Sequence, residues 1–257
     1  MKESHKPKPL IVAHRGSSGS APENTMASFR LAIDEGADMI ELDIRMTKDF
    51  HLIVHHDRDL GRTVRGTGYI REKTLNELKA LDAGSWFSPK FRGEQIPTLR
   101  EVMDILPPHM KLNIEVKTDG ETRQDIAFEE SCILIVREKQ FTERVIISSF
   151  DHKFLKRLHR LDPAIITGAL LLPVRDMAKK PSSLARSIGT KAFICNTKQL
   201  RRRHIQDAHK HHIWVACYSV NTRPQLERML RLGVDAVVTD FPGRMRRAIR
   251  SATSAGH

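Results

Sequence analysis

Pairs of charged residues two positions apart occur at the ends of two short apolar runs of the sequence. In MIELDIR the pair is Glu41 and Asp43, and in LNIEVK it is Glu115 and Lys117. Side chains two positions apart project from one face of a β-strand, so each pair would face one side of its strand. Taken alone, either pair is more typical of a solvated strand edge than of a site. Their significance depends on the elements that bring them together.

Three carboxylates directed at one point would repel one another unless a cation lay between them. Hard divalent cations such as Mg2+ and Ca2+ take oxygen ligands and leave positions for water and phosphate oxygens. A zinc or iron site would favour a tight group of histidines, which the acidic residues here outnumber. We therefore predict one divalent cation, Mg2+ or Ca2+, bound by Glu41, Asp43 and Glu115.

Basic side chains that suit phosphate chemistry also stand at the ends of apolar runs. Cleavage of a phosphodiester needs charge neutralised on the phosphoryl oxygens, a base for the attacking group and an acid for the leaving alkoxide. Arg15, at the end of LIVAHRG, and Lys117 would hold the phosphate. His14 and His56 would share the acid and base roles, because imidazole titrates near neutral pH. A structural bond to a backbone carbonyl is the alternative for His14, but its position at a strand end favours catalysis.

The segment IRMTKDFHLIVHHD decides which of two neighbouring histidines faces the acidic pair. Its two alternating runs indicate a β-hairpin, but the turn lacks the Gly that a tight two-residue loop prefers. We predict a four-residue loop closed by Thr47 and Leu52. In that register His56 lies opposite Asp43, on the same face. A three-residue loop would shift the pairing by one position and bring His55 to that face instead.

The elements that must position these residues form one repeating pattern. Short β-branched runs alternate with amphipathic helical segments, which is typical of βα units around a parallel sheet. Strands are predicted at 10–13, 38–43, 111–116, 145–149, 165–171, 192–195, 213–219 and 235–239. Helices are predicted at 25–35, 98–106, 129–140, 152–161, 199–211 and 224–232. Eight repeats predict an α/β protein with a (β/α)8 TIM barrel, in which the C-terminal strand ends share one mouth.

One segment interrupts the repeat. Residues 44–97 are too long for a βα loop and hold no dominant helix, so we predict a small insertion subdomain after the second strand, within a single barrel domain of residues 1–257. Trp86, Phe87 and Phe91 of this segment could contact an acyl chain, but a packed core under the insertion is the expected role. The histidines near 210 are expected to be structural, because cations favour the end of a helix: His209, His211 and His212.

The amino-acid composition limits the possible binding partners and the cellular compartment of the protein. The 43 Lys and Arg exceed the 31 Asp and Glu and give a net charge of +12, which favours an anionic partner, although most basic residues lie scattered over helical segments. No apolar run approaches the ~18 residues of a membrane span, and MKESHKPKP lacks the apolar core of a secretory signal. With three cysteines in apolar runs, Cys132, Cys195 and Cys217, we expect buried thiols and a cytoplasmic location.

The ordered strings HRG, SAPENT, ELDIRMTKD, LIVHHDRDLGRT, GTG, IPTL, LNIEVK and VTDFP resemble the glycerophosphodiester phosphodiesterase family over nearly the whole chain. The resemblance implies a (β/α)8 barrel with an insertion after the second strand. It implies an acid/base pair in His14 and His56, since the family's His-Asp pair aligns with His56-Asp57, and phosphate contacts from Arg15 and Lys117. The metal ligands that it implies are Glu41, Asp43 and Glu115. It also places Glu23 and Asn24, of the string PENT, near the site.

Two positions depart from the family pattern. Phe50 stands where the family often has a Gly in the hairpin turn, and Tyr218 stands where a Trp is common at a strand end. Tyr218 would keep an aromatic platform for the glycerol or the leaving group.

These residues and the resemblance together predict a phosphoric diester hydrolase that acts on a small-molecule substrate. Its reaction would be hydrolysis of sn-glycerol-3-phosphodiesters to glycerol 3-phosphate and an alcohol. The alternatives on the same site are a lysophospholipid phosphodiesterase and an enzyme that forms a cyclic phosphate. A nucleic-acid binder is not expected, because three carboxylates in the mouth would repel a polyphosphate. The pattern carries no prediction of oligomeric state.

Overall fold

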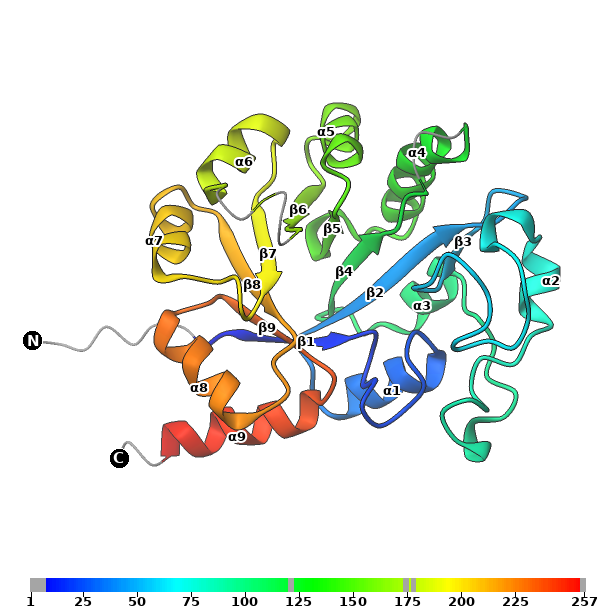
Figure 1. Ribbon diagram of the computed structural model, residues 1–257, viewed down its shortest axis with the longest axis horizontal. Helices are drawn as coiled ribbons and strands as arrows, with labels where there is room; N and C mark the ends of the chain where they lie inside the picture. The colour runs from blue at the N-terminus through cyan, green and yellow to red at the C-terminus, as the bar shows by residue number, and fades with distance from the viewer. Residues whose placement is uncertain (1–7, 120–122, 173–175, 177–178, 255–257) are drawn as a thin grey trace, which may run out of the picture.

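Eight parallel strands close into a ring in the computed structural model, which describes residues 8–119, 123–172, 176 and 179–254 (Figure 1). The ring strands are β1 (Leu10–His14), β2 (Met39–Met46), β4 (Lys111–Val116), β5 (Val145–Ser149), β6 (Ile166–Leu170), β7 (Ala192–Asn196), β8 (Trp214–Tyr218) and β9 (Ala236–Thr239). Strand β1 pairs with both β9 and β2, which closes the ring. The predicted barrel and its eight strands are confirmed. Residues 1–7, which include most of the MKESHKPKP segment, lie outside the described residues.

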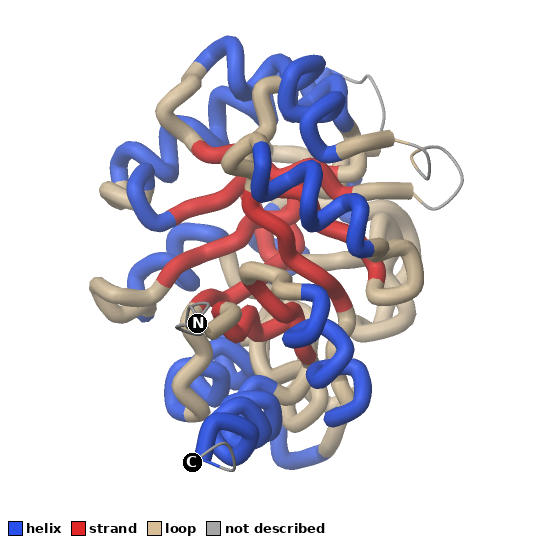
Figure 2. The backbone as a smooth tube through the Cα atoms, turned by 90° about the vertical axis from the view of Figure 1, so that its left-hand side faces the viewer, coloured by secondary structure: helices blue, strands red, loops and turns tan. Residues whose placement is uncertain are grey.

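Helices lie around the ring, and in Figure 2 the red strands occupy the centre with blue helices outside them. They are α1 (Met26–Asp34), α2 (Leu75–Lys79), α3 (Leu99–Ile105), α4 (Arg123–Glu138), α5 (His152–Leu161), α6 (Pro181–Ile188), α7 (Arg202–Lys210), α8 (Arg223–Leu232) and α9 (Pro242–Ser254). Single 3-10 turns occur at η1 (Ile70–Glu72), η2 (Pro89–Phe91) and η3 (Thr142–Arg144). Within the described part of the chain, no helix is both long and apolar enough to cross a membrane.

The predicted helices are present, but the predicted ranges do not include α2, α6, α9 or the first six residues of α4. Helix α4 begins at Arg123, six residues before the predicted start at 129. Helix α6 has the sequence PSSLARSI, which is only eight residues long and buries Leu184 and Ile188 one turn apart. Its ends carry clearer signals: Pro181 is the first helical residue, and Gly189 follows the last with a left-handed φ of 77°.

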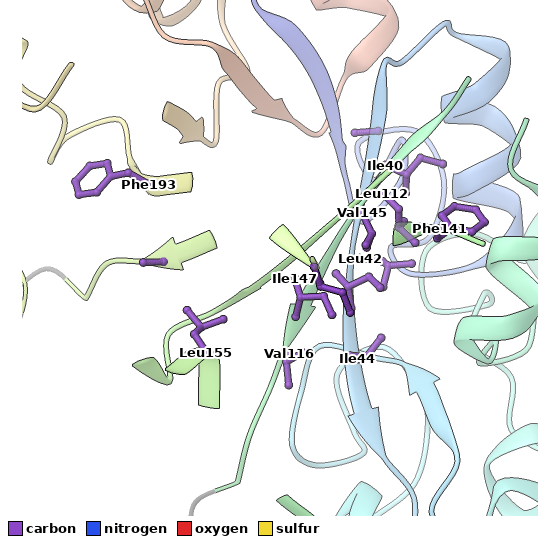
Figure 3. Close-up of a cluster of buried hydrophobic side chains, with 14 of the residues drawn as sticks. Ile40, Leu42, Ile44, Leu112, Val116, Phe141, Val145, Ile147, Leu155 and Phe193 are labelled. Atoms are coloured by element: carbon purple, nitrogen blue, oxygen red, sulfur yellow. The ribbon is translucent and has the colours of Figure 1, made fainter. Parts of the chain in front are cut away.

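Alternation along the strands separates two hydrophobic layers. Ile40, Leu42 and Ile44 of β2 point outward into the core under the helices, together with side chains of β4 and β5 (Figure 3). The intervening residues of β2 therefore point into the barrel. A second cluster fills the barrel interior and consists of Val12, Met39, Leu170, Ile194, Ala216, Ala236 and Val238. This alternation directs Glu41 and Asp43 inward, as the spacing predicted.

All three cysteines are buried and free, as expected. Cys132, Cys195 and Cys217 belong to the outer apolar core, between the barrel and its helices.

The segment between β2 and β4 has a hydrophobic cluster of its own. It contains the strand β3 (Leu52–Val54), and its cluster consists of Ile53, Val64, Ile70, Leu78, Ala83 and Ile96. The three aromatic residues expected in this core are not in it. Trp86 is 41% exposed, and Trp86, Phe87 and Phe91 stack edge to face with centroid separations of 5.6 and 5.7 Å. Division of the chain into one domain with an insertion subdomain at 44–97 stays a prediction, which the separate cluster supports.

The predicted register of the β2–β3 hairpin is wrong by one position. Met46 pairs with Leu52 and Ile44 with Val54. In this register Thr47 lies opposite His51, so the loop consists of the three residues 48–50. Its closure is a hydrogen bond from Thr47 N to His51 O at 3.0 Å. Phe50 makes this loop possible because it adopts a left-handed φ of 64°, the conformation that ends a three-residue hairpin loop.

Candidate active site

Three buried carboxylates meet at the C-terminal end of the barrel. Glu41 and Asp43 extend inward from β2, and Glu115 extends from β4, where it pairs in register with Asp43. One oxygen atom from each of the three lies within 4.8 Å of the others. Glu41 Oε2 accepts a hydrogen bond from Arg15 N at 2.9 Å, whereas Oε1 is buried without a hydrogen-bond partner among the described residues. An acidic oxygen set with one oxygen unsatisfied fits a hard divalent cation.

Two cations and an amide hold this acidic cluster in place. Lys117 Nζ lies 3.0 Å from Asp43 Oδ1 and also pairs with Glu115. Arg15 Nε lies 3.1 Å from Asp43 Oδ2, and Asn24 Nδ2 donates to the same oxygen at 2.9 Å. The structure therefore brings together Arg15, Lys117 and Asn24 with the carboxylates.

Glu23 supports this arrangement from the loop after β1. Its Oε1 accepts a hydrogen bond from Arg15 Nη1 at 2.8 Å, so it fixes the guanidinium whose Nε faces Asp43. Arg15 itself has a left-handed φ of 54°. This turn directs its backbone N–H toward Glu41 while its side chain extends toward Asp43.

Two histidines face one cavity, and each is paired with an aspartate. His14 Nδ1 lies 2.6 Å from Asp240 Oδ1, and His56 Nδ1 lies 2.7 Å from Asp57 Oδ1. With Nδ1 engaged in this way, Nε2 of each ring remains for the cavity. The cavity measures about 180 Å3, and its lining includes His14, His56, Glu41, Glu115, Lys117 and Tyr218.

His56 reaches the cavity for a reason that differs from the predicted one. In the three-residue register His55 lies opposite Asp43, and its N donates to Asp43 O at 2.9 Å. Strand β3 ends at Val54, so strict alternation no longer applies beyond it. Arg45 Nε donates to the carbonyl of His56 at 2.9 Å and holds the turned backbone. His55 is buried instead, and burial lowers its pKa to about 4.

The carboxylates differ in their protonation. Burial and the charge of Asp43 raise the pKa of Glu41 to about 7. Burial also opposes ionisation of Asp43, but the neighbouring Lys117 and Arg15 hold its pKa below the usual range. Burial and Asp43 raise the pKa of Glu115. Added positive charge among them would favour the ionised forms.

The two histidines are shifted in opposite directions. Burial disfavours the charged form of His14, yet the hydrogen bond to Asp240 and the charge of Glu41 outweigh it and raise its pKa. Burial lowers the pKa of His56, and the raising effects of Asp43 and Asp57 do not offset it. Opposite shifts of two groups on one cavity are typical of an acid and a base.

Comparison with known proteins agrees with this geometry. Residues 14–244 match the model of the glycerophosphoryl diester phosphodiesterase family. The chain belongs to this family. A glycerophosphodiester phosphodiesterase of Caldanaerobacter subterraneus is 37% identical over 95% of this chain and 98% of its own length. One from Bacillus subtilis is 36% identical over 91% of this chain and 84% of its own.

Solved structures give the same result for this phosphodiesterase. An Oleispira antarctica phosphodiesterase, in complex with the product sn-glycerol-3-phosphate, superposes with a TM-score of 0.87 at 28% identity and covers 94% of this chain and 97% of its own. A protein of Silicibacter pomeroyi has the same fold, with a TM-score of 0.88 at 24% identity over 97% of this chain and 95% of its own.

Among the residues of the phosphodiesterase site that sequence reasoning missed are Asp240 and Arg62. Asp240 follows the last residue of β9 and also accepts hydrogen bonds from Asn221 Nδ2 at 2.5 Å and Ser18 Oγ at 3.2 Å. The rule that selected His14, a polar residue at a strand end, would have found Asp240 in VTDFP. Arg62 lies in the insertion and pairs with Glu23 and Asp57. Only the tertiary structure shows that contact.

A second cavity of about 320 Å3 lies at the opposite end of the phosphodiesterase barrel. It is lined by residues at the N-terminal ends of the strands, such as Leu10, Met39 and Trp214. None of the predicted site residues lines it. The larger cavity is therefore separate from the predicted site.

Proposed function

We propose that the chain hydrolyses sn-glycerol-3-phosphodiesters to glycerol 3-phosphate and an alcohol, with His14 and His56 as acid and base. The observation that carries the proposal is the pair of His–Asp contacts at 2.6 and 2.7 Å on one cavity that is also lined by two carboxylates, Glu41 and Glu115, and two cations, Arg15 and Lys117. A phosphodiester needs each of these groups, because its charge must be neutralised while one proton is removed and another is supplied.

The acid and base roles follow from the opposite pKa shifts. The lowered pKa of His56 leaves its Nε2 free at neutral pH to accept the proton of the attacking water. His14, with its raised pKa, donates its proton to the leaving alkoxide. Asp57 and Asp240 fix the two rings through Nδ1, so each Nε2 keeps its direction toward the phosphate.

The remaining site residues bind the substrate. Arg15 and Lys117 contact the phosphoryl oxygens, the first through its fork and the second as a point charge. Glu23 and Asn24 orient Arg15 and Asp43 through the hydrogen bonds described above. Tyr218, at the end of β8, faces the cavity and would contact the glycerol or the alcohol.

Glu41, Asp43 and Glu115 would hold one divalent cation, Mg2+ or Ca2+. When bound, such a cation neutralises charge on the phosphoryl oxygens and lowers the free energy of the transition state. Lys117 and Arg15 already contact the same carboxylates and would share them with the cation. A cytoplasmic location and the absence of a nucleic-acid partner stay predictions.

Release of glycerol 3-phosphate tests the proposal. Purified protein would be incubated with glycerophosphocholine and glycerophosphoethanolamine in the presence of Mg2+ or Ca2+, and again with EDTA. We expect glycerol 3-phosphate only with the cation. No release from either substrate would refute the proposed reaction. Phosphorus NMR of the products would detect a cyclic phosphate, and parallel lysophospholipid substrates would reveal the alternative specificity.

A further inference from the structure

One side chain of the insertion bridges two carboxylates beside the site. Arg62 Nη1 and Nη2 donate to the two oxygens of Glu23 at 2.9 and 2.6 Å. Its Nε donates to Asp57 Oδ2 at 2.6 Å, and Nη2 also donates to Asp57 Oδ1 at 3.2 Å. Each carboxylate thus meets two nitrogens of one guanidinium, a planar fork that Lys cannot reproduce.

Both carboxylates have a second partner in the site. Glu23 Oε1 also accepts from Arg15 Nη1 at 2.8 Å, and Asp57 Oδ1 also pairs with His56 Nδ1 at 2.7 Å. Charges therefore alternate along the series Arg15, Glu23, Arg62 and Asp57, and the series ends at the imidazole ring of His56. Arg62 is the middle member and connects the loop after β1 with the loop after β3.

We propose that Arg62 is a positioning residue that fixes His56 through Asp57 and Arg15 through Glu23. With Asp57 held, His56 keeps its proton on Nδ1 and presents the lone pair of Nε2 to the phosphate. Without the guanidinium, Glu23 and Asp57 lose their shared cation, and Asp57 is free to rotate away from the ring. The expected effect of Arg62 on turnover rests on the proposed function, whereas the expected effect on the proton position in the His56 ring does not.

The exposure of Arg62 separates this role from a stabilising one. Its side chain is 46% exposed, and exposed ion pairs contribute only modestly to stability, with bidentate networks such as this one at the upper end of the range. Loss of Arg62 should therefore change turnover more than folding. This difference makes the proposal testable by substitution.

Kinetics of Arg62→Met, with Arg62→Lys as the conservative variant, form the first test. Met removes the charge at similar length, and we expect kcat/KM to fall about 10- to 100-fold, with an unchanged midpoint of thermal unfolding. Lys should restore only part of the activity, because one ammonium group cannot donate twice to both carboxylates. The matched control is Arg65→Met, an exposed residue of the same loop, which should retain wild-type kinetics.

A double-mutant cycle identifies the route of the effect. Because Arg62 also acts through Glu23, the variant Asp57→Asn with Arg62→Met should be slower than Asp57→Asn alone, but by less than the loss that Arg62→Met causes in the wild type. If the decrease in kcat/KM of the double variant equalled the product of the decreases in the two single variants, the proposal would be overturned. A wild-type kcat/KM in Arg62→Met would also overturn it.

Nitrogen-15 NMR of the His56 imidazole ring tests the role of Arg62 without a measurement of turnover. In the wild type we expect His56 as the Nδ1–H tautomer, and in Arg62→Met a mixture of tautomers. An unchanged tautomer in Arg62→Met would contradict the role of Arg62. If the wild type released no glycerol 3-phosphate, the proposed function would fail while this measurement still tested Arg62.

Discussion

His14 and Asp240 meet at 2.6 Å between Nδ1 and Oδ1, although 226 residues separate them in the chain. The contact exists because β1 and β9 are neighbours in the closed ring, and both residues stand at the C-terminal ends of these strands. His56 and Asp57 form the corresponding pair from adjacent positions of the sequence. The cavity of the candidate active site is thus flanked by one pair made by barrel closure and one pair made locally.

Substitution of Asp240 by Asn should impair the acid. Asp240 raises the pKa of His14 against the effect of burial, so its loss should lower that pKa. If protonated His14 is the acid, activity is lost as pH rises through its pKa, and the basic limb of the kcat/KM profile should move to lower pH. We also expect kcat to fall about 100-fold, within the range for a general acid. An exposed control, Asp59→Asn, should leave the profile unchanged, and an unshifted basic limb in Asp240→Asn would contradict the pairing.

The two neighbouring histidines should differ in what they control. His56→Ala should lower kcat by about 10^2 to 10^4 with little change in stability, because the ring is half-buried and lies at the cavity. His55→Leu should retain turnover, because His55 is buried away from the cavity. Steady-state kinetics of the two variants would distinguish the roles of the two histidines. Loss of turnover in His55→Leu but not in His56→Ala would assign the catalytic role to His55.

His55 should also influence acid stability. Burial lowers its pKa to about 4, whereas the ordinary value in an unfolded chain is 6.5, so the unfolded chain binds more protons between these two pH values. The neutral ring therefore contributes stability above pH 6.5 that is lost as pH falls through 4. Urea unfolding of His55→Leu between these values should show a weaker dependence on pH than the wild type. Equal slopes would indicate that His55 does not titrate in this way.

Metal binding should depend on pH through Glu41. Burial and Asp43 raise the pKa of Glu41 to about 7, so without metal the folded protein loses stability as pH rises from the ordinary glutamate pKa of 4.5 through 7. A divalent cation should stabilise the protein most at the upper end, where the carboxylates are ionised. Thermal unfolding in EDTA and in Mg2+ or Ca2+, from pH 5 to 8, would measure this difference. Glu41→Gln should weaken the pH dependence, with the remainder coming from Glu115, whose pKa is also raised, and an unchanged pH dependence would assign the effect to groups other than Glu41.

The hairpin turn contains a residue whose replacement should stabilise the fold. Phe50 has a φ of 64° and is 51% exposed, so its Cβ strains the backbone while its ring buries little. Phe50→Gly should raise the free energy of unfolding by about 1 kcal/mol, because glycine adopts this conformation without the penalty. Phe50→Ala keeps the Cβ and is the matched control. Denaturant unfolding that ranked the Ala variant equal to the Gly variant would exclude backbone strain as the cause.

The amino-acid sequence alone is sufficient to predict the repeating βα units and the inward direction of the acidic pairs. A strand has a side-chain period of two, so Glu41 and Asp43 share a face wherever the strand lies. Counting eight repeats was then sufficient to place three strand ends around one mouth. These inferences need only local periodicity, which each short segment carries in full.

The tertiary structure decided the hairpin register, the partner of His14 and the contacts of Arg62. The register depends on the left-handed conformation of Phe50, which a residue with a Cβ adopts only when surrounding contacts favour it. Asp240 and Arg62 reach the site through barrel closure and through the path of a long insertion. Neither has a period that a sequence displays, because the contacts join segments whose separation along the chain is unrelated to their distance in space.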